Sequence, residues 1–92
     1  MMGLHLEENV SNLLEIIVKS IVGDDNPVLI KVHQPTDSIL VAEIFVPKKT
    51  MGLIIGRHGK TIESIRIILR SSLKQEIAHS FVEVRAIEED TL

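Results

Sequence analysis

Two glycines three residues apart, Gly56 and Gly59, constrain the fold of this chain more than any other feature. They lie in the segment IIGRHGKTI, which spans residues 54–62 and has isoleucines at both ends. Because glycine has no Cβ, the chain can reverse between the two glycines, and another backbone can approach them closely. A helix beginning near Thr61 would point its unpaired N–H groups and positive dipole end toward the same place. The segment therefore predicts a phosphate-contacting turn between two helices.

Basic side chains in the turn support this interpretation. Arg57 and Lys60 carry positive charge, and His58 adds to it when protonated. The competing phosphate motif is the P-loop, GxxxxGK[ST], because the residues from Gly59 onward match its last three positions. Its first glycine would have to stand at position 54, which is Ile54, so the spacing excludes a P-loop.

Apolar periodicity predicts the remaining elements. A first helix is expected over residues 7–22, ended by Gly23, with an apolar face formed by Val10, Leu13, Leu14, Ile17 and Ile21. There follow a hairpin over 28–46 with a turn at 34–38, a short helix from 48 to 55, a longer helix over 60–78 and a strand over 81–87. The longer helix is expected to bury Ile62, Ile65, Ile68, Leu69 and Leu73, and the strands to bury Ile30, Ile44, Val46, Phe45 and Phe81.

The segment IIGRHGKTI resembles the GxxG core of KH domains, and the order helix, strand, strand, helix, GxxG, helix, strand resembles their bacterial, type II arrangement. The resemblance covers nearly the whole chain. It implies an α+β fold in which a three-stranded mixed sheet packs on three helices, as a single KH domain over residues 1–92. Among KH proteins, the chain is most similar to small bacterial single-KH proteins regarded as RNA chaperones. That family is thought to act with a larger Jag-type KH partner and to influence cell shape and cell wall synthesis.

The resemblance implies that the turn clamps about four nucleotides of a single strand by their backbone. The residues expected to bind RNA are Ile55, Gly56, Arg57, His58, Gly59, Lys60, Thr61, Ile62 and Arg66. Ile55 and Ile62 have two interpretations, since either can form the floor of a base-binding groove or belong to the core. Arg66, Arg70 and Lys74 recur every four residues, and this basic stripe either extends the phosphate track or is a solvated helix face. The same two interpretations apply to Lys48 and Lys49.

The charge distribution favours a local polyanion site. The chain has a net charge of −3, but between Pro47 and Lys74 seven basic residues face one acid, against three basic residues and twelve acids elsewhere. A basic patch on an acidic body is typical of local nucleic-acid contact, although charge clusters are often only solvated surface.

Several functional classes have no support in the sequence. There is no cysteine, which fits a reducing cytoplasm, and neither a signal peptide nor an apolar run long enough for a membrane span is present. The four histidines lack the spacing of metal ligands, and no catalytic triad or isolated carboxylate pair is recognisable, so neither an enzyme nor a cofactor site is expected. Without Trp or Tyr, and with both phenylalanines assigned to the core, base stacking on exposed aromatics is not expected either.

These observations predict a cytoplasmic protein that binds single-stranded RNA weakly and with limited sequence preference. Two alternatives stay open: single-stranded DNA as the ligand, and a protein–protein adaptor in which the turn only connects two helices. Ile16 and Ile67 each fall off the apolar face of a long helix, so we expect both to be exposed in a monomer. They are candidates for contact in a homodimer or in a complex with a Jag-type partner.

Overall fold

A computed structural model describes residues 2–73 and 77–87 of the chain. The elements follow in the order α1 (Met2–Val22), β1 (Leu29–Thr36), β2 (Ile39–Val46), η1 (Lys48–Thr50), α2 (Met51–Ile55), η2 (Arg57–Gly59), α3 (Lys60–Ser72) and β3 (His79–Ala86), where η marks a 3₁₀ turn. This order confirms the predicted α+β arrangement. Lys74 and the acidic residues 88–90 lie outside the described residues.

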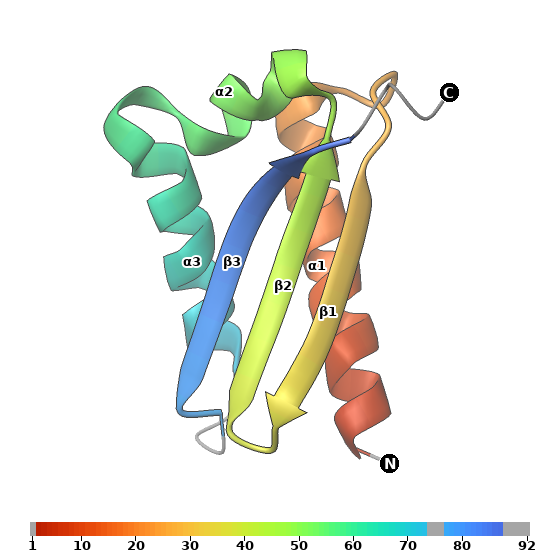
Figure 1. Cartoon of the computed structure of the whole chain (residues 1–92), viewed down its shortest axis with the longest axis vertical. Helices are drawn as coiled ribbons and strands as arrows, with labels where there is room; N and C mark the ends of the chain where they lie inside the picture. The colour runs from red at the N-terminus through yellow and green to blue at the C-terminus, as the bar shows by residue number, and fades with distance from the viewer. Residues whose placement is uncertain (1, 74–76, 88–92) are drawn as a thin grey trace.

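The three strands form one mixed sheet with β2 in the centre. β1 pairs with β2 in antiparallel orientation, and β3 pairs with β2 in parallel orientation. Figure 1 looks onto the face of the sheet that no described helix covers, with α1 and α3 behind the strands and α2 at the end of the sheet. A parallel neighbour requires a crossover connection, and the segment containing α2 and α3 supplies it. The two helices that flank the GxxG turn are therefore held against the edge strand β3.

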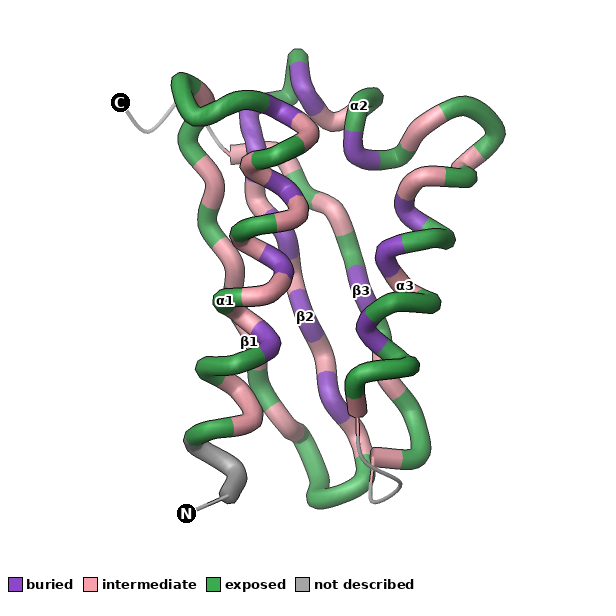
Figure 2. The backbone as a smooth tube through the Cα atoms, turned by 180° about the vertical axis from the view of Figure 1, so that it is seen from behind, coloured by how far each residue is buried: buried purple, intermediate pink, exposed green. Residues whose placement is uncertain are grey.

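The core lies between the sheet and the helices, as the buried residues in Figure 2 show. β2 alternates strictly and buries Leu40, Ala42, Ile44 and Val46 completely. On α1 the buried residues stand four apart, and they are Val10, Leu14, Val18 and Val22. The predicted core positions Ile17 and Ile21 flank this line and are partly buried. Ile54, Ile62, Ile65 and Leu69 close the core from α2 and α3.

The first strand of the hairpin is longer, and its turn shorter, than predicted. β1 continues to Thr36, through Pro35, and only Asp37 and Ser38 separate it from β2. Pro35 is compatible with a strand because β1 lies at the sheet edge and its pairing with β2 is irregular between His33 and Thr36. The hydroxyl of Thr36 accepts a hydrogen bond from the Ser38 N–H at 3.2 Å, which stabilises the short turn.

The bounds of three other elements also differ from the prediction. α1 begins at Met2 rather than residue 7, and β3 spans His79–Ala86 rather than 81–87. α3 ends at Ser72, whereas the apolar pattern predicted a helix to residue 78. The Ser72 hydroxyl donates to the Leu69 carbonyl at 2.8 Å, and such side-chain bonds compete with continuation of a helix.

Three apolar residues are wrongly predicted as core. Phe45 is only partly buried, because the buried residues of β2 alternate with it and its side chain therefore points to the uncovered face of the sheet. Ile68 is 46% exposed, because it lies on the flank of α3 away from the buried residues Ile65 and Leu69. Phe81 is 53% exposed, because β3 buries Val82 and the adjacent side chain must point to the uncovered face of the sheet. The expected exposure of Ile16 and Ile67 is confirmed, at 67% and 49%.

Candidate nucleic-acid interface

The backbone of the GxxG turn is unusual at three positions. Gly56, His58 and Gly59 all have positive φ angles, of 78°, 57° and 73°. Histidine is one of the few residues other than glycine that tolerates this region. The Gly59 N–H donates to the Gly56 carbonyl at 3.1 Å, which closes the turn directly before α3. A backbone hydrogen bond within the chain therefore stabilises the turn.

The two glycines are required for different reasons. A Cβ added at Gly56 would lie 2.1 Å from the Thr61 hydroxyl oxygen and 2.8 Å from the Thr61 backbone nitrogen. A Cβ at Gly59 would meet no atom within 4 Å. Gly56 is therefore needed so that the start of α3 can pack against the turn. At Gly59, glycine is favoured only by the positive φ angle, since the space beside it is open. Thr61, predicted to bind RNA, has a structural role in this packing.

The basic side chains of the turn face solvent. Arg57, His58 and Lys60 are exposed. In the part of the chain that the structure describes, none of the three forms an ion pair. Their charges are therefore available to an anionic ligand near the start of α3, where the helix dipole is also positive.

An open pocket of about 440 Å³ lies beside the turn, between α2, α3 and β3. Its lining consists of Ile55, Ile62, Arg66, Glu83, Val84 and Arg85. Ile55 at the end of α2 is 38% exposed, and Ile62 on the first turn of α3 is 6% exposed. Of the two interpretations, groove floor or core, the structure separates the two isoleucines. Ile55 is a surface residue of the pocket, and Ile62 belongs to both pocket and core.

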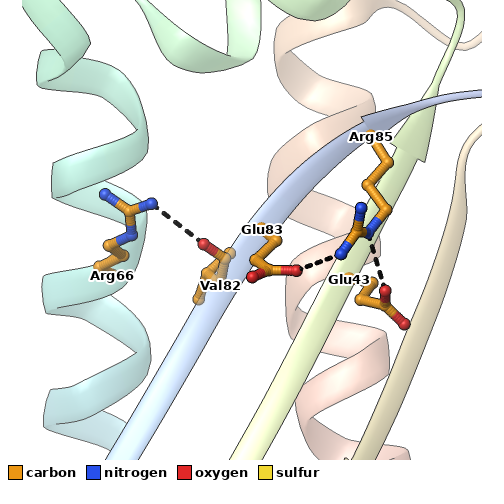
Figure 3. Close-up of polar contacts among 5 residues, drawn as sticks. All are labelled: Glu43, Arg66, Val82, Glu83 and Arg85. Atoms are coloured by element: carbon orange, nitrogen blue, oxygen red, sulfur yellow. Dashed lines mark hydrogen bonds and ion pairs between the residues drawn. The ribbon is translucent and has the colours of Figure 1, made fainter.

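Arg66 connects α3 to the edge strand, as Figure 3 shows. Its guanidinium donates to the Val82 carbonyl at 3.1 Å and lies 3.5 Å from the Glu63 carboxylate. This side chain therefore holds the two walls of the pocket together, in addition to lining it. Arg70, Lys48 and Lys49 are exposed and do not line the pocket.

The outer edge of β3 presents backbone groups to the pocket. The N–H groups of His79 and Ile87 donate to Ser38 and Val46, so the odd-numbered residues direct their backbone groups toward β2. Along a strand, the backbone N–H and C=O groups of successive residues point to opposite sides. The Val82 carbonyl accordingly points away from β2 and toward Arg66. The N–H and C=O of Val84 point the same way. In the described part of the chain, neither has a hydrogen-bond partner outside the sheet.

Glu83 and Arg85 complete the wall as part of a charged cluster. Arg85 donates to Glu43 at 2.8 Å and to Glu83 at 2.6 Å, and it bridges two carboxylates on adjacent strands (Figure 3). The hydrogen bond to Glu43 and the charge of Glu83 raise the pKa of Arg85, which keeps the guanidinium charged. Sequence reasoning missed Glu83, Val84 and Arg85. The alternation of side chains along a strand places Val84 on the opposite face from Glu83 and Arg85. It does not show, however, that this strand borders a pocket.

The sequence and family comparisons agree with this geometry. The profile of the family described as "KhpA/KhpB, KH domain" matches residues 11–86. The chain belongs to the KhpA/KhpB family of KH domains. The pocket and the GxxG turn both fall within the matched range, and the mixed sheet with three helices is consistent with the type II KH fold.

Curated KhpA proteins of several bacteria are similar to this chain. A protein named RNA-binding protein KhpA from Clostridium acetobutylicum is 32% identical over 73 residues, which cover 78% of this chain and 95% of that protein. The protein of the same name from Chlamydia trachomatis is 41% identical over 58 residues, covering 63% of this chain and 73% of the relative. A comparison with solved structures finds no significant match. No helix in the described part of the chain is long and apolar enough to span a membrane.

Proposed function

We propose that this chain binds single-stranded RNA, with the phosphate backbone at the GxxG turn and bases in the adjacent pocket. The observation that supports this most strongly is the position of the pocket directly beside the turn. Arg57, His58 and Lys60 supply charge at one end of the site, and Ile55 and Ile62 supply an apolar surface at the other. RNA presents the same two features, a charged backbone and flat apolar bases. The names of the bacterial relatives support the same ligand.

The Val84 backbone gives the pocket a means of reading a base. Its N–H and C=O supply one donor and one acceptor side by side, and every base carries donors or acceptors on its Watson–Crick edge. Two hydrogen bonds at one position discriminate only modestly, so we expect limited sequence preference. Weak and permissive binding suits an RNA chaperone in the cytoplasm, and this is the role we assign, without catalysis. An effect on cell shape and wall synthesis would then be indirect, through the RNAs that are bound.

A charge-reversal pair tests the site. Changing Arg57 and His58 to Asp lowers the charge of the turn by three with His counted as neutral, and Asp tolerates the positive φ of position 58. The control combines Lys19→Glu with Asn12→Asp on α1, which also lowers the charge by three, at residues that do not line the pocket. With a pool of fluorescent eight-nucleotide RNAs at low salt, the turn variant should lose at least tenfold in affinity and the control less than twofold. A loss below threefold in a folded turn variant would contradict the proposal.

The same assay separates the alternatives. Equal affinity for DNA of matched sequence would show that the ligand class is single strands in general, since backbone clamping barely uses the 2′-hydroxyl. An absence of binding to either nucleic acid would favour the adaptor interpretation.

For assembly, we propose contact through helical surface, either between two copies or with a Jag-type KH protein. The exposed Ile16 and Ile67 motivate this part of the proposal. Light scattering after gel filtration should give a mass above one chain at micromolar concentration, and Ile16→Lys or Ile67→Lys should reduce it. A wild-type mass of one chain would exclude the homodimer, and an unchanged dimer in both variants would place the interface elsewhere.

A further inference from the structure

One face of the sheet carries apolar side chains without a cover. Every described helix lies behind the sheet or at its end, so the near face in Figure 1 is open. The side chains that alternate away from the core point to this face. Among them are Leu29 and Phe81, which are 50% and 53% exposed, and the partly exposed Val41 and Phe45.

The two phenylalanines on this face differ in their surroundings. Phe45 is only partly exposed, and the Lys31 ammonium nitrogen lies 5.1 Å from the centre of its ring. Phe81 pairs across the sheet with Val41 and has His79 and Glu83 as neighbours on its own strand. No cation is found over its ring in the described residues, so more than half of its surface faces solvent. Its ring is thus available for stacking.

The RNA pocket continues onto this face around the edge of β3. Its lining includes Ile62 and Arg66 from the helix side of β3, and also Glu83 and Arg85, whose side chains belong to the open face. Figure 3 shows Arg85 extending across the strands toward Glu43. Phe81 is two residues from Glu83 along β3 on the same face, a distance of about 7 Å. An RNA strand that leaves the pocket over the edge of β3 and follows this face can therefore reach Phe81.

Size and charge favour a base as the occupant. Three strands of eight residues make a face of about 26 by 14 Å, roughly 370 Å². This is about half of the roughly 800 Å² that each partner contributes to a standard protein interface, so a second copy would bury too little area here. Lys31 and Arg85 are balanced by Glu43 and Glu83, so the face offers little attraction to phosphate. An exposed aromatic ring on a neutral surface suits stacking instead.

We infer that Phe81 stacks against a base of the RNA strand that leaves the pocket, so that the domain contacts more nucleotides than the turn alone. This inference rests on the proposed binding of RNA at the turn and the pocket. It departs from the sequence-based expectation of no base stacking, which assumed that Phe81 is buried. Because stacking is apolar, the contact should add affinity without changing the dependence on salt.

The test compares RNAs of four and eight nucleotides of repeated sequence by fluorescence polarisation. Phe81→Leu keeps an apolar side chain and removes the aromatic ring, and Leu29→Ala changes an equally exposed residue at the far strand of the same face. Phe81→Leu should lower affinity for the longer RNA about fivefold, leave the shorter RNA within twofold of wild type, and keep the salt slope. Leu29→Ala should affect neither RNA. No loss in Phe81→Leu, or an equal loss for both lengths, would overturn the stacking contact.

A second measurement locates the contact directly. Eight-nucleotide RNAs carrying 4-thiouridine near either end are crosslinked by light to the wild-type chain, and the products are mapped by mass spectrometry. Crosslinks within β3 at or beside Phe81 are expected, and crosslinks only at the turn and α2 would overturn the inference. Failure of the proposed function is distinguishable, because then wild type binds neither RNA or the Arg57 and His58 reversal has no effect.

Discussion

The turn and the β3 wall of the pocket form one site but are encoded in different ways. The turn is local: residues 56–61 fix its backbone, and its charges follow directly in the sequence. The wall is assembled from residues far apart in the sequence. Val84 lines the pocket because β3 pairs in parallel with β2, and Arg66 of α3 is bonded to the Val82 carbonyl of the same strand. Under the proposed function, the turn supplies affinity for any RNA strand and the wall distinguishes bases.

The largest effect is expected at the start of the turn. Gly56→Ala places a Cβ against both the hydroxyl and the backbone of Thr61 and requires an unfavourable φ of 78°. We expect a loss of about 2–4 kcal/mol in the free energy of unfolding. Gly59→Ala also requires an unfavourable positive φ, but its Cβ would meet no other atom. Its free energy of unfolding should therefore fall by only about 1–2 kcal/mol. Urea denaturation measures the free energy of unfolding of both variants. Equal losses would show that contact with Thr61 is not the reason why position 56 requires glycine.

The two parts of the site should respond differently to salt. Ile55→Ala removes exposed apolar surface from the pocket and should lower RNA affinity about three- to fivefold with an unchanged salt slope. Arg57→Gln should lower it by a similar factor and reduce the slope of log affinity against log salt by about 0.7, the value for one phosphate contact. Titrations at four salt concentrations distinguish these results. A reduced slope in Ile55→Ala would place phosphate in the pocket.

The sequence predicted those parts of the molecule that depend on local chemistry. The order of elements and the end of α1 at Gly23 both followed from periodicity and turn residues. Errors arose where a neighbour decides the outcome. Phe81 looked like a core residue, and only the position of the helices on the opposite face leaves it exposed. Pro35 looked like a turn residue, and the edge position of β1 admits it to a strand.

The candidate site shows the same limit. Ile55 and Ile62 stand on either side of the turn in sequence, yet one is 38% exposed and the other 6%, because Ile62 lies on the face of α3 that packs on the sheet. Arg66 fitted a phosphate-binding stripe, and its bond to the Val82 carbonyl depends on a residue sixteen positions away. Such roles depend on contacts between residues far apart in the sequence, so the neighbouring residues in the sequence do not predict them.

The central claim, that the turn and the β3 wall together form the RNA site, is tested most directly by an NMR titration of the ¹⁵N-labelled chain with a short single-stranded RNA. The account predicts that amide signals of Arg57 to Thr61 and of Val84 shift together as RNA is added, while signals of the exposed side of α1 stay in place. The Arg57→Asp and His58→Asp double variant should abolish both sets of shifts. Shifts confined to α1, or changes at Val84 that persist in the double variant, would contradict the account.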